Sequence, residues 1–279
     1  MLALSPDGRR FATAAMNRDI SLWDAQTGTH IVTLEYSGGI FSLEFLPDGQ
    51  LASGNDDGEI SVWDIVTGSR VQTVNAHNSR IVSLSASQCK LVSGSWDGTV
   101  RVWDTATWEH MRTLKCDYWV MSVTLYPNSE RVAVCARQTL YLWDTELLIA
   151  SEDVRLHSAA VSNDGKWLAV AADESISLYD TSTLDLIWSH NHWSDFISFS
   201  RDSCQLVFAH STNGKVSLID VQTGKCIKSF KHHNVQRAVF SCDGTRVLSG
   251  ESCSIPLRFV PVSSIYKLPM APVDSGMST

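Results

Sequence analysis

The sequence predicts an all-β chain folded as a seven-bladed β-propeller of four-stranded antiparallel blades, and three observations support this. A Trp-Asp dipeptide recurs every 40 residues, a short alternating strand pattern precedes each copy, and turn residues fill the space between strands. The four intact copies are Trp23-Asp24, Trp63-Asp64, Trp103-Asp104 and Trp143-Asp144. Three eroded copies continue the series at Tyr179-Asp180, Ile219-Asp220 and Phe259-Val260, with steps of 36, 40 and 40 residues.

Each repeat contains the signals of four short strands, as the second one illustrates. A strand ends at the turn Pro47-Asp48-Gly49, and the next runs through residues 51–54. The hairpin turn Asp57-Gly58 leads to a strand that ends at Trp63, because Asp-Gly favours tight hairpins. After Thr67-Gly68 the fourth strand covers residues 70–74. Four strands in 40 residues, separated only by turns, are typical of a propeller blade.

Composition excludes several classes of protein. The chain has 279 residues, of which 44% are hydrophobic, so it can build a large core. Its net charge of −8 argues against nucleic acid as a partner, since such proteins carry a basic face. No long apolar run predicts a membrane-spanning helix, and residues 1–8 lack a signal-peptide profile. Seven cysteines without a C-x-x-C pair indicate a reducing, cytoplasmic location.

These repeats resemble the WD-repeat (WD40) family over about residues 1–260. The resemblance implies a buried tetrad in each blade: a His before the first strand, a Ser or Thr on the second, an Asp in the hairpin turn and the Trp. The third repeat matches in full, through His77, Ser93, Asp97 and Trp103. We expect this tetrad to be structural rather than a catalytic triad, because a buried carboxylate needs nearby donors. The other repeats are incomplete, with Asn17, Arg137, Asn213 and Cys253 at the Asp position and Asp57 and Asp173 keeping it.

One mouth of the ring is the predicted partner-binding surface. By alignment it carries residues that precede the first strand of a blade or the turn Asp: Asp56, Arg80, Trp96, Tyr118, Trp119, Trp193 and Asn234. Trp, Tyr and Arg are enriched at binding hot spots. Packing of Trp119 and Trp193 between blades is the competing interpretation. The partners expected are proteins or peptides, bound by a monomeric propeller.

No catalytic, cofactor or metal site is predicted. His190 and His192 share a strand face and His232-His233 lie nearby, but no third ligand is placed to complete a metal site. Phosphate-loop and Gly-x-Ser-x-Gly motifs are absent. The predicted function is a non-catalytic protein–protein interaction scaffold. Two alternatives stay open: the sensor propeller of a larger NTPase-containing protein, as at the C-terminus of fungal NACHT proteins, and a dehydrogenase- or hydrolase-type propeller enzyme.

The predicted domain spans residues 1–268, and residues 269–279 form a disordered tail. Met1 aligns inside the first strand of the first blade. We therefore expect the ring to close without an interlocked blade. The last blade would take its outer strand from residues 264–268, and side-chain packing alone would join it to the first.

Overall fold

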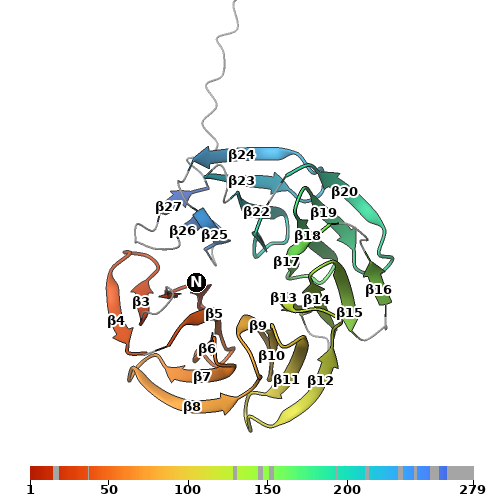
Figure 1. Cartoon of the computed structure of the whole chain (residues 1–279). Coiled ribbons are helices and arrows are strands. Elements are labelled where there is room, and N and C mark those ends of the chain that lie inside the picture. The colour runs from red at the N-terminus through yellow and green to blue at the C-terminus, as the bar shows by residue number, and fades with distance from the viewer. Residues whose placement is uncertain are drawn as a thin grey trace, which may run out of the picture.

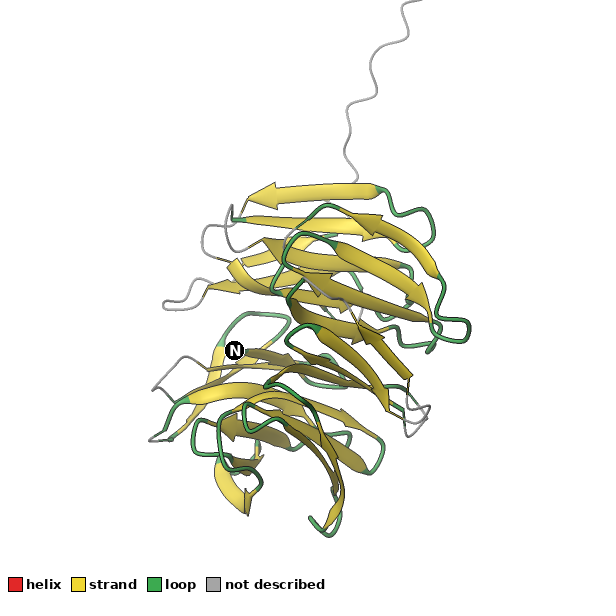
Figure 2. Ribbon diagram, turned by 45° about the vertical axis from the view of Figure 1, so that its right-hand side comes forward, coloured by secondary structure: helices red, strands yellow, loops and turns green. Residues whose placement is uncertain are grey.

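The computed structural model arranges antiparallel sheets in a ring around a central axis (Figure 1). It describes residues 1–14, 19–36, 38–127, 131–143, 147–150, 154–192, 194–210, 214–231, 235–241, 244–251 and 258–262. Every regular element in these ranges is a β-strand, joined by turns and loops (Figure 2). The all-β prediction is confirmed for this part of the chain.

Six blades contain four strands each, in chain order from the axis outward. Blade 1 comprises β1 (Leu2–Leu4), β2 (Arg10–Ala14), β3 (Ile20–Asp24) and β4 (His30–Leu34). Blade 2 comprises β5 (Ile40–Phe45), β6 (Leu51–Asn55), β7 (Glu59–Asp64) and β8 (Ser69–Asn75). Blade 3 comprises β9 (Ile81–Ser87), β10 (Lys90–Ser95), β11 (Thr99–Asp104) and β12 (His110–Lys115).

The remaining sheets follow the same order. Blade 4 comprises β13 (Val120–Leu125), β14 (Val132–Ala136), β15 (Thr139–Trp143) and β16 (Leu147–Ala150). Blade 5 comprises β17 (Leu156–Val161), β18 (Trp167–Ala172), β19 (Ile176–Asp180) and β20 (Leu186–His190). Blade 6 comprises β21 (Phe196–Phe199), β22 (Gln205–His210), β23 (Lys215–Asp220) and β24 (Cys226–Lys231). The C-terminal sheet comprises β25 (Val235–Phe240), β26 (Arg246–Glu251) and β27 (Arg258–Pro261).

In five of the six four-stranded blades, an Asp at the end of the third strand organises the turn to the fourth strand. In blade 2, Asp64 Oδ1 accepts hydrogen bonds from the backbone N–H groups of Val66 and Thr67, at 2.7 and 3.1 Å. These bonds hold the pKa of Asp64 below its ordinary value. The same arrangement occurs at Asp24, Asp104, Asp180 and Asp220. A carboxylate at this position therefore fixes the chain reversal that starts the outer strand.

The prediction of seven four-stranded blades is wrong. The described residues form six such blades, and the C-terminal sheet that follows them has three strands. In the register of this sheet, Pro261 stands opposite Arg246 as Asp24 stands opposite Arg10, so the carboxylate that caps the reversal is missing. Residues 264–268, predicted as an outer strand, and the predicted tail at 269–279 lie outside the described residues.

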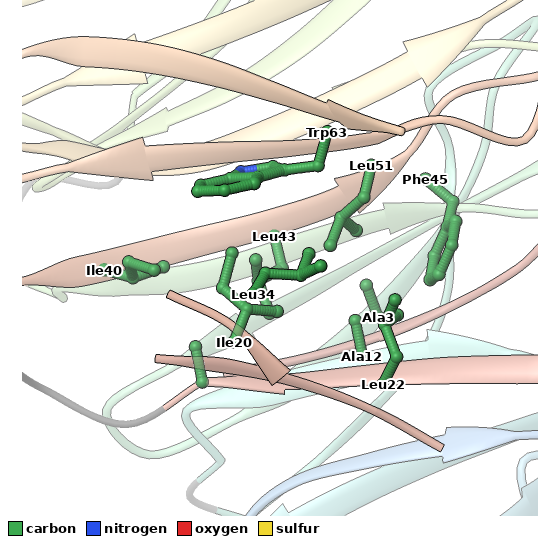
Figure 3. Packing of buried hydrophobic residues seen from close by; sticks show 11 residues of the cluster. Ala3, Ala12, Ile20, Leu22, Leu34, Ile40, Leu43, Phe45, Leu51 and Trp63 are labelled. Atoms are coloured by element: carbon green, nitrogen blue, oxygen red, sulfur yellow. The ribbon is translucent and has the colours of Figure 1, made fainter. Parts of the chain in front are cut away.

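The core lies between neighbouring sheets rather than at the axis. Blades 1 and 2 enclose one apolar cluster, in which Leu22, Leu34, Leu43 and Trp63 are buried (Figure 3). Similar clusters fill the spaces between the other neighbours around the ring. Each sheet thus buries both of its faces, one against each neighbour.

Serine side chains add polar links between inner strands. Ser42 Oγ donates to the carbonyl of Ile81 in blade 3 at 3.2 Å. Ser83 Oγ accepts the N–H of Val123 in blade 4 at 3.1 Å, and Ser122 Oγ accepts that of Ala159 in blade 5 at 3.4 Å. These bonds satisfy backbone groups that the inner strands, at a sheet edge, cannot pair within their own blades.

The ends of the described chain meet where blade 1 adjoins the C-terminal sheet. β1 pairs with β2 inside blade 1, and the three described strands of the C-terminal sheet come from residues 235–261. Leu2, Phe11 and Leu248 form the buried contact there. The Arg246 guanidinium also donates to the carbonyl of Gln26 at 3.4 Å.

Candidate functional site

The structure brings together all four predicted tetrad residues of blade 3. The indole N–H of Trp103 donates to Ser93 Oγ at 2.9 Å, and Ser93 Oγ lies 2.7 Å from His77 Nε2. His77 Nδ1 lies 3.2 Å from Asp97 Oδ2. Since a carboxylate can only accept, Nδ1 carries the proton and Nε2 accepts from the serine hydroxyl. The result is one directed chain, from indole through hydroxyl and imidazole to carboxylate.

Electrostatics keep this chain in a single protonation state at neutral pH. Burial lowers the pKa of His77 to about 4, although Asp97 opposes the shift, so the imidazole is neutral. Burial alone would raise the pKa of Asp97. Hydrogen bonds from Thr99 and from the backbone of Asn78 outweigh it and hold the pKa below its ordinary value.

A Ser, a His and an Asp in a row also suggest a hydrolytic triad, but here a substrate cannot reach the serine hydroxyl. Ser93 has no exposed surface, and its oxygen already accepts the indole N–H of Trp103. The His77 side chain is also fully covered. A nucleophile must reach its substrate, and this hydroxyl faces only the interior of the blade.

Two other blades keep the Trp–hydroxyl bond without a histidine. Trp63 Nε1 donates to Ser53 Oγ at 2.9 Å, and Trp23 Nε1 donates to Thr13 Oγ1 at 2.8 Å. In blade 2 the ring of Tyr36 lies edge-on to Trp63, with centroids 6.0 Å apart, and its hydroxyl accepts from Asn55 at 2.6 Å. Tyr36 precedes the first strand as His77 does. The tetrad pattern has a His at this position, so the sequence did not indicate a role for this tyrosine.

Blade 5 contains a different His–Asp pair. His157 Nε2 lies 2.6 Å from Asp173 Oδ1, and His157 Nδ1 lies 3.9 Å from Asp195 Oδ1 in the loop before blade 6. His157 lies inside β17 instead of before it, so alignment to the tetrad pattern missed this pair. Asn17, Asn213, Cys253 and the pair at 232–233 lie outside the described residues.

The predicted partner-binding residues lie on one rim because of strand order. In an antiparallel pair, the start of the first strand and the end of the second meet at the same edge. Arg80 and Trp119 directly precede first strands, whereas Asp56, Trp96 and Arg137 follow second strands. Trp193 and Asn234 lie outside the described residues.

Four of the rim residues form a stack, which we call the rim cluster: Phe41, Arg80, Trp96 and Trp119. The guanidinium carbon of Arg80 lies 3.7 Å from the ring centroid of Phe41 and 4.3 Å from that of Trp96. Trp96 and Trp119 follow at 5.8 Å between centroids, with ring planes inclined at 45°. Phe41 was not among the predicted rim residues because it belongs to a strand rather than to a loop.

The rim cluster is ordered at its inner end and open at its outer end. Phe41 is buried, and Arg80 Nε is buried without a hydrogen-bond partner. The backbone N–H of Trp96 donates to the carbonyl of Arg80 at 3.0 Å, which fixes the two loops together. Trp96 and Trp119 are 40% and 51% exposed. The two tryptophans therefore present apolar surface to solvent on a rigid base.

Tyr118 and Asp56 lie on the same rim but outside the stack. The Arg137 guanidinium carbon lies 5.5 Å from the ring centroid of Tyr118, which is 42% exposed. Asp56 is exposed, and its N–H donates to the carbonyl of Gly39 at 3.2 Å. The rim around the cluster is therefore amphipathic, with a second Arg–aromatic pair and a carboxylate.

His190 and His192, considered for metal binding, lie in a row of rings instead. Their centroids are 6.2 Å apart, and the row continues to Trp188 on one side and Phe208 on the other. No group of three His, Cys, Asp or Glu side chains with the geometry of a metal site occurs within the described residues. Nor does that part of the chain contain a helix long and apolar enough to cross a membrane.

We expect Trp103→Ala to destabilise the protein more than Tyr179→Ala. Trp103 is 4% exposed, and its removal leaves a cavity and takes from Ser93 the hydrogen bond that the indole donates, whereas Tyr179 is only partly buried. Loss of a buried Trp costs about 3–5 kcal/mol. Urea unfolding of both variants measures this difference. Equal losses would contradict the role given to the tetrad.

We also expect acid to weaken the tetrad through His77. Its pKa in the folded state, about 4, lies below the ordinary 6.5, so the unfolded chain binds the extra proton between these values. Stability is thus complete above pH 6.5 and falls as the pH drops towards 4. Between pH 7 and pH 5 this amounts to about 2 kcal/mol. Urea unfolding should show a flatter pH profile for His77→Gln than for the parent; parallel profiles would contradict the assignment.

Comparison with known proteins agrees with the repeat pattern. The family model "WD domain, G-beta repeat" matches residues 2–24, 28–64, 68–104 and 224–255. No curated protein matches the chain. Among solved structures, a chain of "Crystal Structure of Mitotic Checkpoint Complex" is similar with a TM-score of 0.84 at 19% identity, covering 94% of this chain and 90% of that one. At that identity the likeness concerns the fold alone. The protein is thus a β-propeller, and in the matched segments its repeats are similar to the WD40 repeat.

Proposed function

We propose that the protein is a non-catalytic scaffold for protein–protein interaction and that its partner binds at the rim cluster. WD40 propellers are typical of interaction scaffolds. The single observation that carries the proposal is the pair of exposed tryptophans, Trp96 and Trp119, stacked outward from Arg80 on one rim. Trp and Arg are the residues that most often dominate binding energy.

The arrangement of the rim cluster favours binding because its side chains are already ordered in the free protein. Arg80 is held between two rings, so it loses little side-chain entropy when a partner covers it. Covering the exposed faces of Trp96 and Trp119 removes apolar surface from water. Peptides or protein loops with an apolar side chain and a carboxylate match this surface, the carboxylate facing the guanidiniums. A monomeric propeller suffices for this mode of binding.

The covered tetrad supports the non-catalytic part of the proposal. The serine–histidine pair that most resembles a hydrolytic centre is enclosed within blade 3. Its bonds join the loop before β9, the second strand and the third strand of one blade. We infer that the tetrad supports the rim by fixing the loop at His77 that leads to Arg80.

The double variant Arg80→Ala/Trp96→Ala should lose its partner while remaining folded. Each hot-spot residue contributes about 2 kcal/mol or more, so we expect affinity to fall by about 30-fold for one substitution and, if the two contributions add, by about 1,000-fold for both. The partner is first identified by crosslinking through a photoreactive residue at position 119, and affinity is then measured by calorimetry. The melting temperature of the variant should stay within a few degrees of the parent.

A matched control lies on the outer strand of blade 3. Met111 is 47% exposed, and the guanidinium carbon of Arg112 lies 5.1 Å from the ring centroid of Trp143. Met111→Ala/Arg112→Ala therefore removes an exposed apolar residue and a stacked Arg from the side of the ring. It should bind as the parent does. If the rim variant stays folded and binds equally well, the binding surface lies elsewhere.

A further inference from the structure

The inner strands enclose a channel whose wall is unusually polar. The channel has a volume of about 330 Å³ and is lined by residues of β1, β5, β9, β13, β17, β21 and β25. Its lining includes the hydroxyl groups of Ser85, Thr124, Ser158 and Ser198. This volume lies at the small end of ligand-binding pockets. The channel therefore suits a small polar ligand better than a peptide.

Strand register explains why one channel residue is charged. Ser42, Ser83, Ser122 and Ser158 occupy the same position of four inner strands, each opposite the next-to-last residue of the second strand. Arg237 takes this position in the C-terminal sheet, opposite Gly250. Three of the serines bond to the backbone of the next blade, and two of them do so as acceptors, a role that an arginine side chain cannot take. Its guanidinium carbon instead lies 5.0 Å from the ring centroid of Phe196.

A carboxylate shares the channel with this guanidinium. Glu44 lies on β5, two residues after Ser42, and its Oε1 accepts one hydrogen bond, from the N–H of Ala86 at 3.3 Å. Glu44 and Arg237 both line the channel and influence each other electrostatically. Among the described residues, neither forms a salt bridge within 4.0 Å.

The charges of Glu44 and Arg237 only partly offset the effect of burial on each other's pKa. Burial raises the pKa of Glu44 to about 7, with the Ala86 N–H and Arg237 opposing the shift. Burial lowers the pKa of Arg237 to about 10, with Glu44 opposing that shift. Both residues are half-buried and open to the channel, so a ligand that brings an opposite charge to each of them supplies the close partner that each one lacks among the described residues.

We propose that the channel binds a small zwitterion of the α-amino acid class, its carboxylate on Arg237 and its ammonium group on Glu44. The guanidinium has donors for both carboxylate oxygens, and a carboxylate that accepts the Ala86 N–H can accept further hydrogen bonds from the ammonium group. Thr124 and Ser198, on neighbouring inner strands, offer hydroxyls for the remaining polar atoms. This site is separate from the rim cluster, so its test does not depend on the proposed function.

Other charged groups near the channel must be considered in the test. His157 and Asp195 line the channel, and His157 contacts both Asp173 and Asp195. The Met1 amine lies near Arg237 and is bonded to the carbonyl of Ala14. Proton exchange on binding is assigned to Glu44 only where Glu44→Gln removes it.

The direct experiment is calorimetric titration of the whole chain with the standard α-amino acids near pH 7. At least one should bind, whereas acetate and methylammonium, each carrying half of the charge pattern, should bind at least about tenfold more weakly. Because the ammonium group stabilises ionised Glu44, binding should release protons. This release appears as a dependence of the heat on the ionisation enthalpy of the buffer. No binding by any amino acid, or binding without proton release, overturns the proposal.

Three variants locate the site. Glu44→Gln and Arg237→Gln should each weaken binding by about tenfold or more, and the first should abolish proton release. Asp195→Asn, which alters another carboxylate of the same channel, should bind as the parent does. Should the glutamine variants fail to fold, the dependence of the parent's binding heat on the ionisation enthalpy of the buffer still tests the proposal. Unchanged binding in folded Glu44→Gln and Arg237→Gln overturns the assignment.

Discussion

A four-stranded sheet has two faces, and in this ring only the two neighbouring sheets can cover them. The buried side chains lie accordingly in clusters between neighbours, such as the one that joins Leu22 and Leu34 of blade 1 to Leu43 of blade 2. Every blade therefore depends on the next, and the shape of the ring follows from this mutual burial. The polar features occupy the places that this packing leaves: the interior of blade 3, the rim and the channel.

The tetrad and the rim cluster are parts of one arrangement. His77, held by Ser93 and Asp97, precedes Asn78 and Ser79, and Arg80 follows directly before β9. Asp97 adds a bond from the N–H of Asn78 at 3.0 Å. The loop that carries Arg80 is thereby fixed at its base, and the neighbouring turn carries Trp96. Rigid support of exposed aromatic residues is what a binding surface needs, because a fixed side chain loses little entropy on binding.

Much of this could be predicted from the sequence, for reasons that particular residues make clear. The 40-residue period and the Trp-Asp pairs identify repeats because in the first three blades the Asp caps a turn and the Trp donates to a hydroxyl one strand away. The predicted blade count was wrong at the C-terminal sheet, where Pro261 occupies the position of the capping Asp. Tyr36 and His157 escaped notice because they fulfil polar roles outside the expected pattern. Glu44 and Arg237 escaped because only the register of all inner strands brings them to one channel.

The most direct test of the central claim, that the rim cluster is the binding surface, is amide hydrogen exchange of the protein alone and bound to its crosslinked partner. If the rim cluster is the binding surface, amide exchange slows on binding in the segments around Phe41, Arg80, Trp96 and Trp119, all on one rim. Exchange does not change in the outer strands β8 and β12, which face away from the axis in Figure 1. Protection confined to those outer strands, with the rim segments unchanged, would contradict it.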